Sequence, residues 1–324
     1  MPLYTANAIV LRRLNFGETD RIVTLYTRER GKLSGIAKGA RKAISRLSGS
    51  TETFVYGRFQ LASGKNLEVI TQVEVKASFP RIRADLHRSA NASYIMEMVE
   101  KMVEEHDTNP EMFDLMLSTL YLMERPNHPE KITHMFELQF MKMLGYQPIL
   151  DGCVRCRRVK RIRDSGFGIQ GETGRQEDGK TRRSEDGETG GQALRYGPPF
   201  IAPTQGNRGD GEEGRQGGRN RGPEPPLTPP WQGGNVLFFS PSMGGLVCAE
   251  CGPLPEDAIP ITVQTVEVMS ALTVADAHAV EVMDVPREVL DQMAHVMRWY
   301  IRYRSERELK SLEFLQSLRV EGGE

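Results

Sequence analysis

The sequence predicts an α+β protein of several domains: a small N-terminal β-barrel, an α-helical bundle, and a four-cysteine metal site interrupted by a long polar insertion. Three observations support this fold class. Apolar residues alternate with period two over residues 5–77, they recur at helical spacing after residue 80, and all four cysteines lie in two Cys-x-x-Cys pairs. A chain of 324 residues is long enough to bury more than one core.

The first part of the chain contains five short segments with the residue types and spacing of β-strands, separated by turn residues. They are 6–13, 20–28, 32–39, 53–62 and 66–75. Five short strands in so short a stretch indicate a small antiparallel barrel. Their number and length fit the OB-fold, which often binds nucleic acid, although other small barrels share the pattern.

The middle of the chain has helical periodicity in three segments: 91–106, 110–123 and 129–145. Pro110 and Pro129 stand where a first helical residue is expected, and Gly145 closes the third segment. Many of the 15 methionines lie on these helices, where adaptable core packing is favoured over a methionine-lined groove for a partner. Three further segments, 261–273, 286–305 and 309–318, are also predicted to be helical and to pack on the middle helices.

Residues 158–235 differ in composition from the rest of the chain. They hold 18 of the 32 glycines and 8 of the 19 prolines, with 13 Lys and Arg interleaved with 11 Asp and Glu. Such a segment buries too little apolar surface to offset the entropy lost on ordering, so it is predicted to be a disordered insertion.

The four cysteines are expected to form one structural zinc site, one ion per chain, from Cys153, Cys156, Cys248 and Cys251. The two pairs are 91 residues apart, but loop-closure entropy grows only with the logarithm of loop length, so a disordered insertion lets them meet. Two alternatives compete with zinc: paired free thiols, and a redox Cys-x-x-Cys, which here lacks a βαβ context.

Catalytic chemistry has little support in the sequence. The six histidines form no His-Glu-x-x-His motif, and neither cysteine pair follows the proline and the upstream His-x-Glu of the nucleotide deaminases. The letters of a phosphate-binding loop ("GRQEDGKT", 174–181) and of a dinucleotide-binding glycine motif ("GFGIQG", 166–171) occur only within the glycine-rich stretch 158–235, where neither follows a predicted strand, so they give no support to nucleotide binding. We therefore expect a protein that is not an enzyme.

Positive charge is concentrated at the N-terminus, despite a net charge of −1. Residues 1–80 carry 13 Lys and Arg against 6 Asp and Glu, whereas residues 236–324 carry 7 against 14. The stretch "AKGARKAISRLSG" at 37–49 forms a glycine-containing cationic loop between two predicted strands, suited to phosphates. A solvated loop is the alternative. With neither a secretory signal nor a membrane-spanning apolar run, a cytoplasmic location is expected.

These motifs, in this order, resemble the RecO family of bacterial recombination mediators. The matching stretches are "AIVLRRLNFGETDRIVTLYTRERGKLSGIAKGARKAISRL", "FVYGRFQL", "LEVITQVEV", "FPRIR", "FELQFMKMLGYQPILDGCVRC" and "FSPSMGGLVCAEC". The insertion 158–235 has no counterpart in the usual pattern, where a short hairpin joins the cysteine pairs. The resemblance implies four parts: an OB-fold domain (1–79), a helical domain (80–150 and 258–324), a zinc ribbon (151–157 and 236–257) and the insertion.

The resemblance also implies a function in DNA repair and recombination at the bacterial nucleoid. The expected protein binds single- and double-stranded DNA, anneals complementary strands, and with RecR helps load RecA onto DNA coated by single-stranded-DNA-binding protein. Matching motifs assigns the DNA contacts to basic residues of the barrel: Arg13, Arg21, Lys38, Arg41, Lys42 and Arg46. Two alternatives stay open: a zinc-ribbon accessory factor of transcription or translation that binds nucleic acid without annealing it, and a metalloenzyme.

Overall fold

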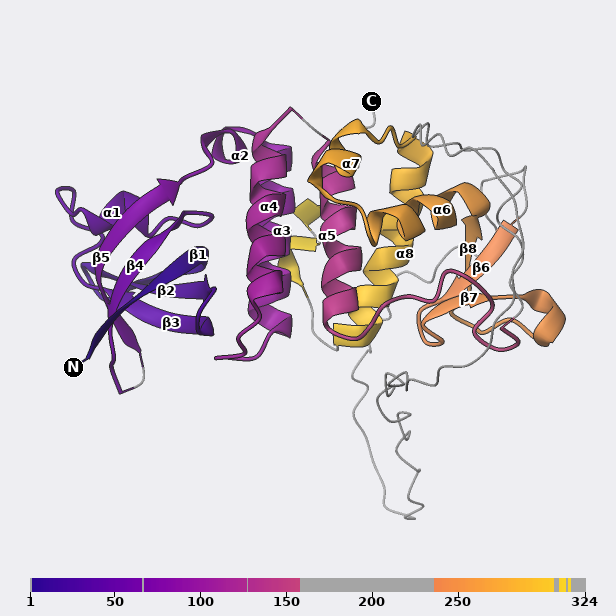
Figure 1. Ribbon diagram of the computed structural model, residues 1–324, viewed down its shortest axis with the longest axis horizontal. Helices are drawn as coiled ribbons and strands as arrows, with labels where there is room; N and C mark the ends of the chain where they lie inside the picture. Colours follow the sequence, from indigo (N-terminus) through magenta and orange to yellow (C-terminus); the bar gives the residue numbers. More distant parts are fainter. Residues whose placement is uncertain are drawn as a thin grey trace, which may run out of the picture. The chain divides into compact units, whose positions relative to one another are not determined.

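Five strands form an N-terminal barrel in the computed structural model, which describes residues 2–65, 67–126, 128–157, 236–305, 309–312 and 314–315. The strands are β1 (Leu3–Phe16), β2 (Asp20–Thr27), β3 (Gly31–Ala37), β4 (Tyr56–Ala62) and β5 (Glu68–Ala77). Their order around the barrel is β1-β2-β3-β5-β4, with β4 pairing back to β1 (Figure 1). This arrangement confirms the predicted five-stranded OB-like barrel. The predicted insertion, 158–235, lies outside the described residues.

The barrel is closed unevenly. β1 pairs with both β2 and β4, whereas β3 and β5 meet through two parallel pairs, Gly35 with Glu68 and Ile36 with Val69. A bulge between Val10 and Arg12 bends β1, as bulges do where a sheet curls. The interior is a separate small core, which includes the side chains of Val10, Val23, Leu25, Leu33, Phe59, Leu61 and Ile70.

The middle of the chain folds into the three predicted helices: α3 (Leu86–Met102), α4 (Pro110–Glu124) and α5 (Pro129–Met143). Asp85 and Asn109 cap the first two by accepting hydrogen bonds from the backbone N–H groups of Arg88 (2.9 Å) and Met112 (3.0 Å). Prolines occupy the first position of α4 and α5, as predicted. Two short helices, α1 (Leu47–Ser50) and α2 (Pro80–Ala84), have too few residues to show periodicity in the sequence.

After the insertion the described residues include the strands β6 (Val236–Ser240), β7 (Gly245–Val247) and β8 (Ile259–Thr262) and the helices α6 (Val263–Leu272), α7 (Ala277–Val282) and α8 (Arg287–Ser305). The strands form a sheet in the order β7-β6-β8. The helix predicted over 261–273 begins two residues later, because Ile261 and Thr262 pair with β6. Three of the four residues at 259–262 are β-branched and suit a strand, and Thr262 then caps α6 by accepting from Thr265 N–H.

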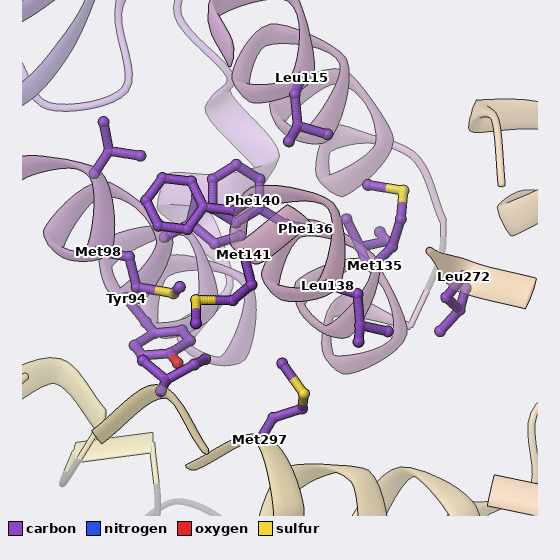
Figure 2. Packing of buried hydrophobic residues seen from close by; sticks show 14 of the residues in the cluster. Tyr94, Met98, Leu115, Met135, Phe136, Leu138, Phe140, Met141, Leu272 and Met297 are labelled. Carbon is purple, nitrogen blue, oxygen red and sulfur yellow. The ribbon is translucent and has the colours of Figure 1, made fainter. Parts of the chain in front are cut away.

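The main core lies where α3, α5, α6 and α8 pack together (Figure 2). Phe136 and Phe140 of α5 stack with ring centroids 5.4 Å apart, and Tyr94, Met98, Met141 and Met297 belong to the same core (Figure 2). Most methionines on these helices are buried, and Met102 and Met143 are partly buried against the same core, which confirms that they serve core packing rather than an exposed groove. Among the described helices, none is long and apolar enough to cross a membrane.

Lys32 and Tyr26 join the barrel to the helices. The Lys32 ammonium donates to the backbone carbonyls of Glu100 (2.6 Å) and Val103, at the C-terminal end of α3. These carbonyls have no partner within the helix, and a cation there also complements the helix dipole. Tyr26 donates to the carbonyl of Asn109 at 3.3 Å, and burial raises the pKa of Tyr26 to about 12.

Candidate nucleic-acid interface and metal centre

Two short turns bring the cysteine pairs together beside the β7-β6-β8 sheet. The chain at Ile149 runs parallel to Gly245. The Ile149 N–H donates to the Gly244 carbonyl (3.0 Å), and the Leu246 N–H donates to the Ile149 carbonyl (2.9 Å). The approach is close: a Cβ on Gly245 would lie 2.5 Å from the Ile149 carbonyl oxygen. This backbone pairing aligns the turn at Cys153–Cys156 with the turn that follows β7.

The four thiols have the spacing of a tetrahedral metal site. All four Sγ atoms lie within 4.8 Å of one another. Cys153 is 3.7 Å from Cys251 and Cys156 is 3.7 Å from Cys248, while Cys248 and Cys251 are 2.9 Å apart. Four sulfurs at the usual zinc–sulfur distance would be separated by about 3.8 Å. The four residues therefore fit a metal ion, and the thiol set is compatible with zinc.

Backbone N–H groups favour the thiolate at this site. Burial raises the pKa of the Cys153 thiol, but hydrogen bonds from the backbone N–H groups of Cys156, Arg155 and Cys248 together lower it by more, and the net result is a pKa of about 6. Hydrogen bonding with Cys248 raises the pKa of Cys251. Without an ion, four thiols this close share protons rather than ionise together, whereas a bound cation favours the thiolate form of all four.

The basic loop between β3 and α1 is exposed, and backbone contacts hold its base. Lys38, Lys42 and Arg46 are all exposed, and none of the three forms an ion pair with another described residue. Asp20 accepts a hydrogen bond from Gly39 N–H at 2.8 Å, which together with Thr19 and the nearby lysines lowers the pKa of Asp20. The loop therefore presents its cations from a defined position on the barrel.

Arg41 connects this loop to the turn between β1 and β2. Its backbone N–H donates to the Thr19 carbonyl (2.9 Å), and its guanidinium donates to the Gly17 carbonyl (2.8 Å). Arg41 is exposed, so it can still meet a phosphate, but part of its hydrogen-bonding capacity already fixes the two loops together.

Arg13 and Arg21 lie differently from the loop cations. Both pair with Glu52, through Arg13 Nε at 2.9 Å and Arg21 Nη1 at 3.0 Å. Arg21 is only 9% exposed and also donates to the Ser48 carbonyl (2.9 Å), so it holds α1 against β2. Assignment of these two residues to DNA contacts stays a prediction, and the geometry indicates that Arg21 has little capacity left for a phosphate.

The barrel also exposes two apolar residues near the loop, and no sequence pattern indicates one of them, Ile44. Ile44, within the loop, is 95% exposed, and Phe16, at the end of β1, is 51% exposed. Of the other barrel aromatics, Tyr26, Phe54 and Phe59 are buried, as alternation predicts. The alternation that flags buried positions gives no signal for a single apolar residue in a loop, which is why Ile44 was missed.

Comparison with known proteins places this geometry in a family. Residues 1–79 match the family model described as "Recombination protein O N terminal". Residues 83–180 and 233–313 match the model described as "Recombination protein O C terminal", which leaves out 181–232 within the insertion.

Full-length relatives agree with the family models. A DNA repair protein RecO of Symbiobacterium thermophilum is 29% identical over 320 residues, covering 98% of this chain and 99% of that protein. Another, of Pelotomaculum thermopropionicum, is 29% identical and covers 97% of this chain and 94% of its own length. The DNA repair protein RecO of Heliobacterium modesticaldum is 40% identical over 167 residues, which are 51% of this chain and 60% of that protein.

Proposed function

The chain belongs to the RecO family, which has a role in recombination and DNA repair, and on this premise we propose that it is a DNA-binding recombination mediator. It binds single- and double-stranded DNA and anneals complementary strands. With RecR it helps load RecA onto DNA coated by single-stranded-DNA-binding protein, at the nucleoid of a bacterial cell.

The exposed loop with Lys38, Lys42 and Arg46 is the observation that carries this proposal. Within the described part of the chain none of these three cations forms an ion pair, although Asp20 lies near Lys38 and Lys42, and Arg41 and Asp20 hold the loop in place. Cations at fixed positions neutralise backbone phosphates and release the counterions condensed on DNA, which supplies affinity that is independent of base sequence.

Annealing follows from the same charge distribution without any catalytic residue. Two complementary strands repel each other through their phosphates, and a basic surface that contacts both lowers this repulsion. Base pairing then provides the driving force. Phe16 beside the loop and Ile44 within it supply exposed apolar surface against which an unpaired base can pack. The surface therefore suits single strands, whose bases are still accessible.

The proposed cofactor is one structural zinc ion held by Cys153, Cys156, Cys248 and Cys251. Bound zinc would supply four metal–thiolate bonds that cross-link the two turns. Thiolates then fill all four positions of a tetrahedral site, so no position is left for a water or a substrate, and the proposed function includes no chemical step. Its contribution is to fold the ribbon.

Annealing of complementary strands precoated with single-stranded-DNA-binding protein tests the proposal. The purified protein is expected to accelerate annealing, and RecA loading on the coated strand is expected to require RecR as well. Binding of the strands without any acceleration of annealing would contradict the proposal and support the zinc-ribbon accessory factor instead.

A further inference from the structure

A groove lies between the turn after β6, the segment before β8 and the C-terminal end of α8. Its volume is about 710 Å³, and its walls are mainly apolar, formed by Pro241, Pro255, Ile259, Trp299 and Tyr303. Trp299 and Tyr303 are one helical turn apart, so they stand side by side on α8, and Tyr303 is 53% exposed. Grooves of this size bind ligands, and no residue of the metal centre or the basic loop lines this one.

The charged residues of the groove indicate which ligand it suits. Asp257 is already satisfied, because its two oxygens accept from the Ser240 hydroxyl (2.7 Å) and Ser242 N–H (2.7 Å). Glu256 is exposed, and Arg302 lies over the Trp299 ring at 5.8 Å. Two carboxylates against one guanidinium disfavour a phosphate backbone. The aromatic and proline walls of the groove instead favour an apolar peptide segment without negative charge.

Prolines and aromatic rings together match one established mode of peptide recognition. Proline-rich segments adopt the polyproline II conformation and dock in aromatic-lined grooves, losing little entropy because the conformation is preformed. This chain contains such a segment, "RNRGPEPPLTPP" at 219–230, in which two arginines precede prolines spaced as Pro-x-x-Pro. We propose that the groove binds a proline-rich peptide in the polyproline II conformation, and that its occupant is residues 225–230 of this chain.

The tether is long enough for this occupant. Pro230 and Val236 are six residues apart in the sequence, which span up to about 20 Å when extended. β6 has five residues, a rise of about 17 Å, and the groove begins at Pro241, directly after β6. A short tether gives an effective concentration of about 1 mM, so a peptide that binds with a Kd of about 0.1 mM in trans would fill the groove about 90% of the time in cis.

Tryptophan fluorescence of the full-length protein tests the proposal. Of its two tryptophans, Trp231→Phe leaves only Trp299, which reports on the groove. In this background the double change Pro226→Ala and Pro229→Ala is expected to raise acrylamide quenching of Trp299 at least about twofold, because the occupant is lost. A synthetic peptide of residues 219–230 should reverse the increase and saturate below about 1 mM.

Two further variants complete the experiment. The matched control, Pro198→Ala with Pro199→Ala, removes two prolines elsewhere in the insertion and should leave quenching unchanged. Tyr303→Ala should weaken peptide binding at an unchanged melting temperature, because the Tyr303 ring lines the groove and is 53% exposed. Equal quenching in all the proline variants, with no effect of the peptide, would refute the proposal. So would protection of Trp299 by a single-stranded oligonucleotide in place of the peptide.

Discussion

Replacement of Cys248 by serine is expected to remove the metal and to destabilise much more than the turn that holds it. Cys248 contacts every other cysteine of the cluster: its Sγ lies 2.9 Å from Cys251 and 3.7 Å from Cys156, and its backbone N–H donates to Cys153 Sγ at 3.4 Å. A serine hydroxyl is a poor zinc ligand at neutral pH, so the variant keeps three thiols and a weakened site.

The expected loss of stability is large because the β7-β6-β8 sheet, which the metal centre adjoins, packs on the main core. Phe239, Leu246 and Ile261 belong to the main core, and the Phe239 ring lies 5.5 Å from that of Tyr300 on α8. A metal that binds only the folded state stabilises it by about 4 kcal/mol when its free concentration is about 1,000 times its Kd. At about 2–4 °C per kcal/mol, loss of the metal lowers the melting temperature by about 8–16 °C.

Zinc content and thermal unfolding, each with and without a chelator, measure this effect. The parent is expected to hold one zinc per chain and to melt lower in chelator, whereas Cys248→Ser should hold little zinc and be insensitive to chelator. Ala249→Ser is the control, since it adds a hydroxyl at an exposed neighbouring position and leaves all four thiols in place. Zinc-free parent protein, or a Cys248→Ser variant with full zinc and an unchanged melting temperature, would refute the reasoning.

Two other changes test the contacts between the described elements. Lys32→Met removes the ammonium that donates to the carbonyls of Glu100 and Val103, so it should lower the free energy of unfolding in urea by about 1–3 kcal/mol. The control Lys65→Met, at an exposed position, should leave the free energy of unfolding almost unchanged. Equal losses in the two variants would contradict the role of this contact. Burial raises the pKa of Glu97, but hydrogen bonds from Ser311 and from the Lys310 N–H lower it below its usual value. A carboxyl group whose pKa is lower in the folded state stabilises the folded protein at pH values above its unfolded pKa of 4.5. This stabilisation is lost as the pH falls through the folded-state pKa. Glu97→Gln should therefore melt below the parent at pH 7, and a gap that stays constant down to about pH 3 would contradict this account.

Local patterns in the sequence were sufficient to predict the regular elements. Period-two alternation located all five barrel strands, and helical spacing with Pro110 and Pro129 located α4 and α5. The predicted strand at 53–62 begins late, at Tyr56, because Phe54 has a positive φ of 72° and turns the chain. β8 was missed because its pairing with β6 is a long-range contact, which periodicity does not report.

The candidate site was predictable to a different degree in its two parts. Paired spacing identified the four cysteines, and the structure brings them together. For the cations, charge alone does not distinguish an exposed side chain from a buried one. Arg21 and Lys38 are both basic residues of the barrel segment, and the sequence does not separate them. In the structure Arg21 is buried against Glu52, because its position in β2 faces inward, whereas Lys38 is exposed. The division into domains at 79, 150 and 258 stays a prediction.

The salt dependence of binding to single-stranded DNA tests most directly whether the basic loop of the barrel is the DNA interface. Combining Lys38→Ala, Lys42→Ala and Arg46→Ala removes three of the loop's four exposed cations and leaves Arg41 to hold the loop in place. The slope of log affinity against log salt should fall by about 2, which weakens binding about 100-fold at 0.1 M salt. Combining Arg81→Ala, Lys142→Ala and Lys310→Ala removes the same charge from exposed positions outside the barrel and should change the slope little. If the loop variant follows the parent across the titration, or if both triple variants weaken alike, the DNA interface is not this loop.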